Sequence, residues 1–66
     1  MQVIHIHWEG SEYHVVRVAE EHPPELLFCD SPEELAGVLR WLGVAQPKVN
    51  YVMRQLEVGP DAMVSG

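Results

Sequence analysis

The 66 residues of this chain suffice for one small domain, and 47% of them are hydrophobic. The formal net charge of −6 is unevenly spread: residues 1–34 hold one basic and eight acidic side chains, whereas residues 35–66 hold three basic and two acidic ones. This acidity argues against a general nucleic-acid or anionic-membrane surface, and no apolar stretch approaches the roughly 20 residues of a membrane span.

The first element that we expect is a β-hairpin over residues 2–19. Its two arms alternate in character, and Gly10-Ser11 between them suits a two-residue type II′ turn. This turn would pair Trp8 with Tyr13 and His7 with His14, and the period of two then sorts the side chains by face. The core face collects Ile4, Ile6, Trp8, Tyr13 and Val15, with Arg17 at its margin. The opposite face collects Val3, His5, His7, Glu9, Glu12, His14, Val16 and Val18.

The next stretch, residues 20–24, ends in two prolines. Proline cannot continue the ladder of a central strand, so we expect a connection here. The short apolar run over residues 25–30 predicts a third strand that is buried on both faces. Its Cys29 is expected to be a structural residue rather than a nucleophile, because apolar surroundings and the neighbouring Asp30 disfavour the thiolate.

A helix over residues 32–42 follows. Ser31 is a typical N-cap, Pro32 suits the first helical position, and Glu34 completes a capping box. Apolar residues recur at helical spacing, and Gly43 is placed to end the helix.

A second helix is predicted over residues 47–58. Pro47 opens it, apolar residues again recur at helical spacing, and Gly59-Pro60 stops it. We expect residues 59–66 to form a tail, in which Ala62–Val64 is compatible with a brief strand.

These elements predict a single α+β domain over residues 1–66, in the order β-β-β-α-α. The hairpin and the third strand would form a three-stranded antiparallel sheet, with both helices packed on one face.

The opposite face of this sheet is too apolar to be fully solvated. A single cysteine excludes an internal disulfide and favours a cytoplasmic setting, which leaves a metal or a partner chain to stabilise so short a domain. We therefore expect a homo-oligomer, in particular a dimer, across the Val3, Val16 and Val18 side or the edge of the first strand. The expected function is a non-enzymatic binding or interaction module, for itself or another protein, with no membrane partner.

His5, His7 and His14 suggest a second function, metal binding. The register places all three on one face, and directly opposed Cβ atoms lie about 4.5–5.5 Å apart. Three imidazoles with an open position are typical of zinc sites, and Glu9 or Glu12 would add a carboxylate; nickel and copper also accept such ligands. The alternative is a set of polar surface or interface residues, and only these histidines would support an enzyme.

A third function is suggested by residues 38–56. The pattern of Leu42, Gly43, Val44 and Ala45, followed by Val49 and Val52, resembles the turn and recognition helix of a helix-turn-helix regulator. The resemblance implies DNA binding by the outward face of the second helix, through residue types that contact phosphates and base edges: Lys48, Asn50, Tyr51, Arg54 and Gln55. The alternative is an ordinary pair of helices of which the second has a polar face.

Overall fold

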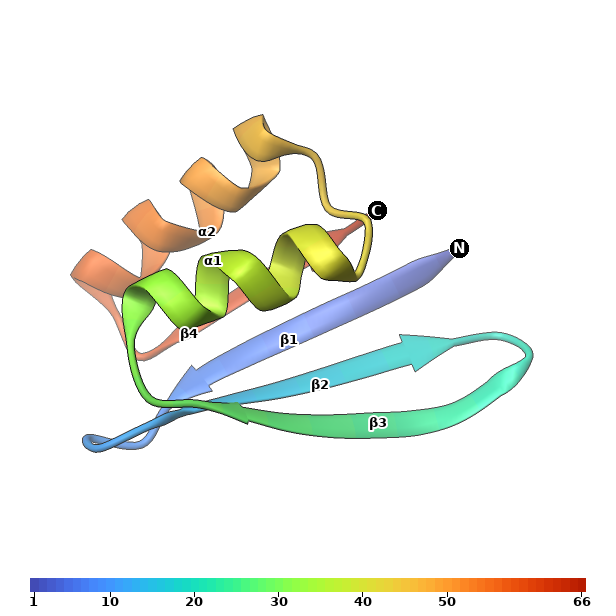
Figure 1. Ribbon diagram of the computed structural model, residues 1–66, viewed down its shortest axis with the longest axis horizontal. Coiled ribbons are helices and arrows are strands. Elements are labelled where there is room, and N and C mark those ends of the chain that lie inside the picture. Colours follow the sequence, from blue (N-terminus) through green and yellow to red (C-terminus); the bar gives the residue numbers. More distant parts are fainter.

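The elements follow one another in the order β-β-β-α-α-β, and the strands form one antiparallel sheet in the order β3-β2-β1-β4. The computed structural model describes residues 1–66. The elements are β1 (Gln2–Trp8), β2 (Tyr13–Ala19), β3 (His22–Cys29), α1 (Pro32–Trp41), α2 (Gln46–Val58) and β4 (Asp61–Ser65). Both helices lie on one face of the sheet, which gives the molecule two layers (Figure 1). Neither helix combines the length and the apolar character needed to cross a membrane.

Strands β1 and β2 form the predicted hairpin in the predicted register. Trp8 pairs with Tyr13 and His7 with His14, and the Glu9 N–H donates to the Glu12 carbonyl at 3.0 Å. Gly10 has a φ of 96°. A type II′ turn requires a positive φ at its first central residue, which explains why glycine stands there.

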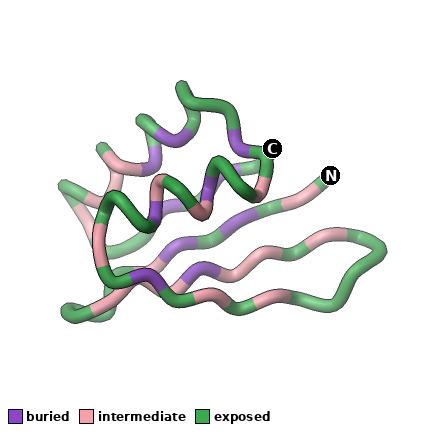
Figure 2. The backbone as a smooth tube through the Cα atoms, viewed as in Figure 1, coloured by how far each residue is buried: buried purple, intermediate pink, exposed green.

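The core lies between the helices and the inner face of the sheet (Figure 2). No polar side chain is buried in it. As predicted, the hairpin contributes Ile4, Ile6 and Val15 to this core. Trp8 and Tyr13 share that face at its margin, with ring centroids 4.5 Å apart. The full set of buried side chains is Ile4, Ile6, Val15, Cys29, Leu35, Leu39, Val44, Val49, Val52, Ala62 and Val64.

The third strand differs from the prediction in its start and its burial. It begins at His22, so the two prolines belong to it and the predicted connection is wrong. β3 is an edge strand, and alternate residues of a strand direct their N–H groups to the same side. Pro24 is two residues from Leu26, whose N–H points away from β2. The N–H group that Pro24 lacks would therefore not have bonded to β2. The prediction of burial on both faces is also wrong: Cys29 is buried, whereas Leu26 is 55% exposed.

The predicted tail is in fact the fourth strand, so the sheet has four strands and not three. β4 pairs antiparallel with β1, with Ile4 opposite Val64 and Ile6 opposite Ala62. Ala62 and Val64 are buried, and this burial fixes the strand on the core. β4 pairs with the side of β1 that the hairpin leaves open. The edge of β1 is therefore not available for the predicted dimer contact.

The helices match the predicted limits to within one residue. The Ser31 hydroxyl accepts from the Glu34 N–H at 3.2 Å, as expected of an N-cap. At the end of α1, Gly43 has a φ of 92°. Its N–H donates to Arg40 O, and the Val44 N–H donates to Leu39 O, which is a Schellman motif. The α2 helix, in contrast, has Ala45 at its N-cap and no side-chain cap.

Candidate functional site

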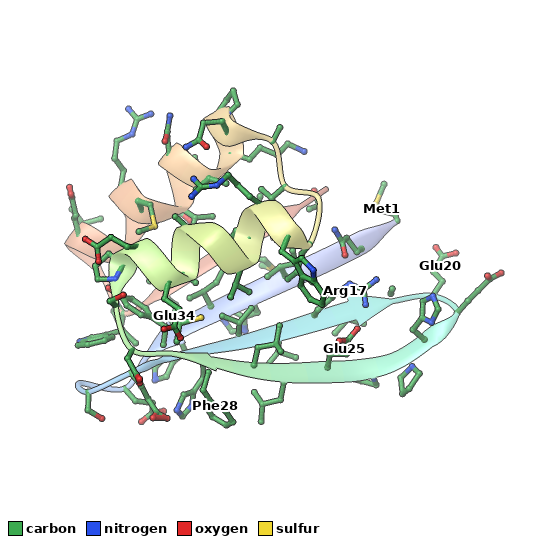
Figure 3. All side chains as sticks on the ribbon, viewed as in Figure 1. Met1, Arg17, Glu20, Glu25, Phe28 and Glu34 are labelled. Carbon is green, nitrogen blue, oxygen red and sulfur yellow. The ribbon has the colours of Figure 1, made fainter.

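The candidate site is the outer face of the sheet, which no helix covers. Figure 3 shows Phe28 pointing away from the helices on this face. Each of the four strands contributes every second residue, and the register brings these four sets of positions side by side. These residues, defined here as the open face, are Val3, His5, His7, His14, Val16, Val18, Leu26, Phe28, Asp61 and Met63, together with Glu9 and Glu12 at the hairpin turn.

One part of the open face is apolar. Val3 is 37% exposed, Val18 49%, Leu26 55%, Phe28 53% and Met63 61%. The solvated face of an antiparallel sheet normally carries polar residues at such positions. The predicted interface residues Val3, Val16 and Val18 thus lie together, and β3 and β4 add three larger side chains that the hairpin pattern alone did not identify.

The other part of the open face, near the hairpin turn, is a network of histidines and carboxylates. His7 Nδ1 lies 2.7 Å from Asp61 Oδ1, and His7 Nε2 lies 3.1 Å from Glu9 Oε1. His5 Nε2 lies 3.5 Å from the same Asp61 oxygen. His14 Nε2 lies 3.1 Å from Glu12 Oε2.

His14 also packs its ring edgewise on Phe28, at 4.8 Å between centroids. This contact joins the polar and apolar parts of the open face.

The two contacts of His7 favour its protonated form. Carboxylates only accept hydrogen bonds, so a ring that donates to both Asp61 and Glu9 must carry a proton on each nitrogen. The hydrogen bond to Asp61 is the largest cause that raises the pKa of His7 above 6.5, the charges of Asp61 and Glu9 add to it, and partial desolvation opposes it. Both contacts therefore stabilise the cationic form of His7 between two carboxylates.

The three histidines share a face, as predicted, but their rings do not converge on one point. His5 and His7 meet at Asp61, whereas the other nitrogen of His7 and Nδ1 of His14 approach Glu9, the latter at 3.9 Å. No three histidine, cysteine, aspartate or glutamate side chains are arranged to hold a metal ion. Zinc binding stays a prediction, and it would require His7 to leave one of its carboxylates.

Asp61 is the residue of this network that sequence reasoning missed. It lies 54 positions from His7 in the chain. The signal that points to it is the alternation of buried Ala62 and Val64 with exposed neighbours after the Gly59-Pro60 break. Such an alternation reveals a strand but does not say which strand it pairs with.

The five residues predicted to contact DNA all lie on α2, but most already have partners within the chain. Lys48 Nζ donates to the Ser65 carbonyl at 2.6 Å. The Asn50 side-chain oxygen accepts from Gln46, and Gln55 donates to the Tyr51 hydroxyl. Arg54 is exposed and forms no ion pair. DNA binding by this helix stays a prediction.

Two other features carry less chemistry. The Cys29 thiol is buried, and burial raises its pKa, with further contributions from Glu34 and Asp30; these factors suppress the thiolate. A hollow of about 560 Å³ lies at the opposite end of the sheet. Its Arg17 guanidinium is already held by Gln2 and Glu25.

Searches of protein-family models, curated proteins and solved structures found no match to this chain.

Proposed function

We propose that this protein is a non-enzymatic binding module that acts as a homo-oligomer, with the open face of the sheet as its contact surface. The observation that carries the proposal is the apolar part of that face, where Leu26, Phe28 and Met63 are each more than half exposed. Burying such side chains against a partner contributes about 25 cal/mol per Å² of apolar surface.

The open face is also self-complementary. Across the strands, Val3 pairs with Val18, whereas Leu26 and Met63 lie in one row with Val16 and His5 between them. A two-fold axis parallel to the strands, above the middle of the sheet, stacks two copies so that Val3 meets the partner's Val18 and Leu26 meets the partner's Met63. The histidine networks then meet each other, and each network brings imidazoles that offset its carboxylates, which limits repulsion between two chains of charge −6.

The size of the chain supports a partner chain as well. A single copy exposes 4251 Å². A standard interface buries about 800 Å² on each partner, which would remove close to a fifth of that surface from water. Small single domains bury too little surface to be robustly stable alone. We place the protein in the cytoplasm, because its one thiol is buried and forms no disulfide.

Sedimentation equilibrium of the wild type and of Phe28→Glu, from micromolar to several hundred micromolar, tests the proposal. Because Phe28 is one of the large exposed side chains of the apolar part, a charge at this position should weaken association at least tenfold and lower the average mass. The matched control is Trp41→Glu on α1, because Trp41 is an aromatic that is 74% exposed away from the open face. A wild type that remains monomeric throughout, or a Trp41→Glu variant that dissociates equally, would contradict the proposal.

A further inference from the structure

The outer edge of β4 offers main-chain hydrogen-bonding groups that the monomer does not use. The Trp8 N–H donates to Pro60 O at 2.8 Å, and the Gly66 N–H donates to Gln2 O at 3.2 Å. These two bonds establish which residues of β4 direct their backbone N–H and C=O groups toward β1. They are Ala62 and Val64. The N–H and C=O groups of the alternate residues therefore point away from the sheet; these residues are Asp61, Met63 and Ser65.

The two edges of the sheet are not equally protected. On β3, Pro23 and Pro24 remove donors, and the register shifts between Arg17 and Ala19 as at a β-bulge. Prolines and bulges are the features by which edge strands avoid pairing with other chains. β4 has neither of them, and only the Ser65 carbonyl is covered, by Lys48 Nζ at 2.6 Å.

We propose that a second copy of this chain adds its own β4 to this edge, antiparallel and with the two-fold axis at Met63. Met63 then pairs with the partner's Met63, and Asp61 pairs with the partner's Ser65. This register satisfies the outward-pointing groups of all three residues in both strands. The two sheets become one continuous sheet, with the α2 helices side by side on the same face.

Charge and shape favour this register over its neighbours. Lys48 lies at the Ser65 end of β4, so in this register its positive charge lies at the end of the partner strand that begins at Asp61. A register centred on Ser65 would instead place Lys48 against the partner's Lys48 and would pair fewer residues. A groove of about 350 Å³ beside β4 is lined by Tyr51, Gln55 and Met63. The partner's copies of the same side chains fill it.

This contact goes beyond the proposed function, because it uses the main-chain groups at the edge of β4, whereas the open-face contact uses the side chains of the sheet's outer face. The edge axis is perpendicular to the sheet, whereas the open-face axis lies parallel to the strands. A closed tetramer with D2 symmetry would require these two axes to intersect.

The test is made in the Phe28→Glu variant, so that the open-face contact and the edge contact fail separately. Phe28→Glu should remain a dimer in sedimentation equilibrium, held by the edge. Adding Met63→Pro should give a monomer, because proline removes the N–H at the axis, which the monomer does not use. Adding Met63→Ala instead shortens the same side chain but retains the N–H, and this variant should remain a dimer.

A monomeric Phe28→Glu variant would overturn the edge contact while supporting the open-face one. A Met63→Pro double variant that remains dimeric would also overturn it. Circular dichroism establishes that each variant is folded.

Amide hydrogen exchange of the wild type provides a second measurement that needs no substitution. The Met63 N–H should be protected, and its protection should rise with protein concentration, because only the edge contact bonds this group. Ala62, whose N–H faces β1, is the internal reference. An open-face dimer alone leaves the Met63 amide unprotected, so an unprotected rate at millimolar concentration would overturn the proposal.

Discussion

Among the side chains of the open face, His7 has the most unusual surroundings. Both of its ring nitrogens face carboxylates, one from β4 and one from the hairpin turn. Its neighbour across the hairpin, His14, was predictable from the turn alone, because a two-residue turn fixes the register of the whole hairpin. Asp61 was not predictable in the same way, since no local rule specifies a pairing between residues 54 positions apart.

Asp61→Asn should lower the pKa of His7 toward 6.5, because the hydrogen bond to the Asp61 carboxylate is the main cause of its raised value. Glu9→Gln should lower it less, because Glu9 contributes less. Histidine proton resonances followed by NMR between pH 5 and 9 measure both. A His7 pKa that does not move in Asp61→Asn would contradict this account.

The same linkage predicts a stability profile. The pKa of His7 is higher in the folded chain, so its contribution to stability is full below pH 6.5 and is lost as the pH rises through the folded value. Urea denaturation should therefore show that, as the pH rises from 6.5 through the folded pKa of His7, the free energy of unfolding falls more for the wild type than for His7→Gln.

At the scale of the elements, local signals were accurate where the chemistry is local. Ser31 and Gly43 marked the start and the end of α1, because caps and left-handed glycines act within one helical turn. β3 and β4 were assigned less well. Whether a strand lies at an edge, and which neighbour it pairs with, depends on the packing of the whole chain. The prolines of β3 predict a break, because proline is excluded from central strands and is tolerated only at edges.

The two helix starts allow a matched pair of predictions. Ser31→Ala removes the hydroxyl that accepts from the Glu34 N–H and should lower the free energy of unfolding by about 1 kcal/mol. Ala45→Asp should raise it by about 0.5–1 kcal/mol, because Ala45 already has the extended backbone of an N-cap, with φ −67° and ψ 149°. The first turn of α2 has no acidic residue, so the new carboxylate would also favour the helix dipole.

Urea denaturation at a fixed protein concentration measures both changes. Equal effects of the same sign would contradict the assignment of the two caps.

For the molecule as a whole, assembly and folding are linked, since a contact between copies stabilises only the folded chain. The thermal midpoint should rise by about 3–5 °C for each tenfold increase in protein concentration, if unfolding is coupled to dissociation of a dimer. The double variant Phe28→Glu/Met63→Pro lacks both proposed contacts and should melt at a midpoint independent of concentration. Differential scanning calorimetry at several concentrations tests this, and a wild-type midpoint that does not move would exclude assembly in that range.

The pairing of β4 with β1 also determines the order in which the fold can form. The hairpin closes a short loop, whereas the β1–β4 ladder closes one that is roughly tenfold longer, at an entropic cost about 2 kcal/mol greater. The hairpin should therefore form early and β4 should dock late. Until it docks, the backbone of β1 is unpaired along one side, and Ile4 and Ile6 lack the cover of Val64 and Ala62. The intermediate that precedes this late step is therefore prone to aggregation, and the yield of refolding should fall as the chain concentration rises.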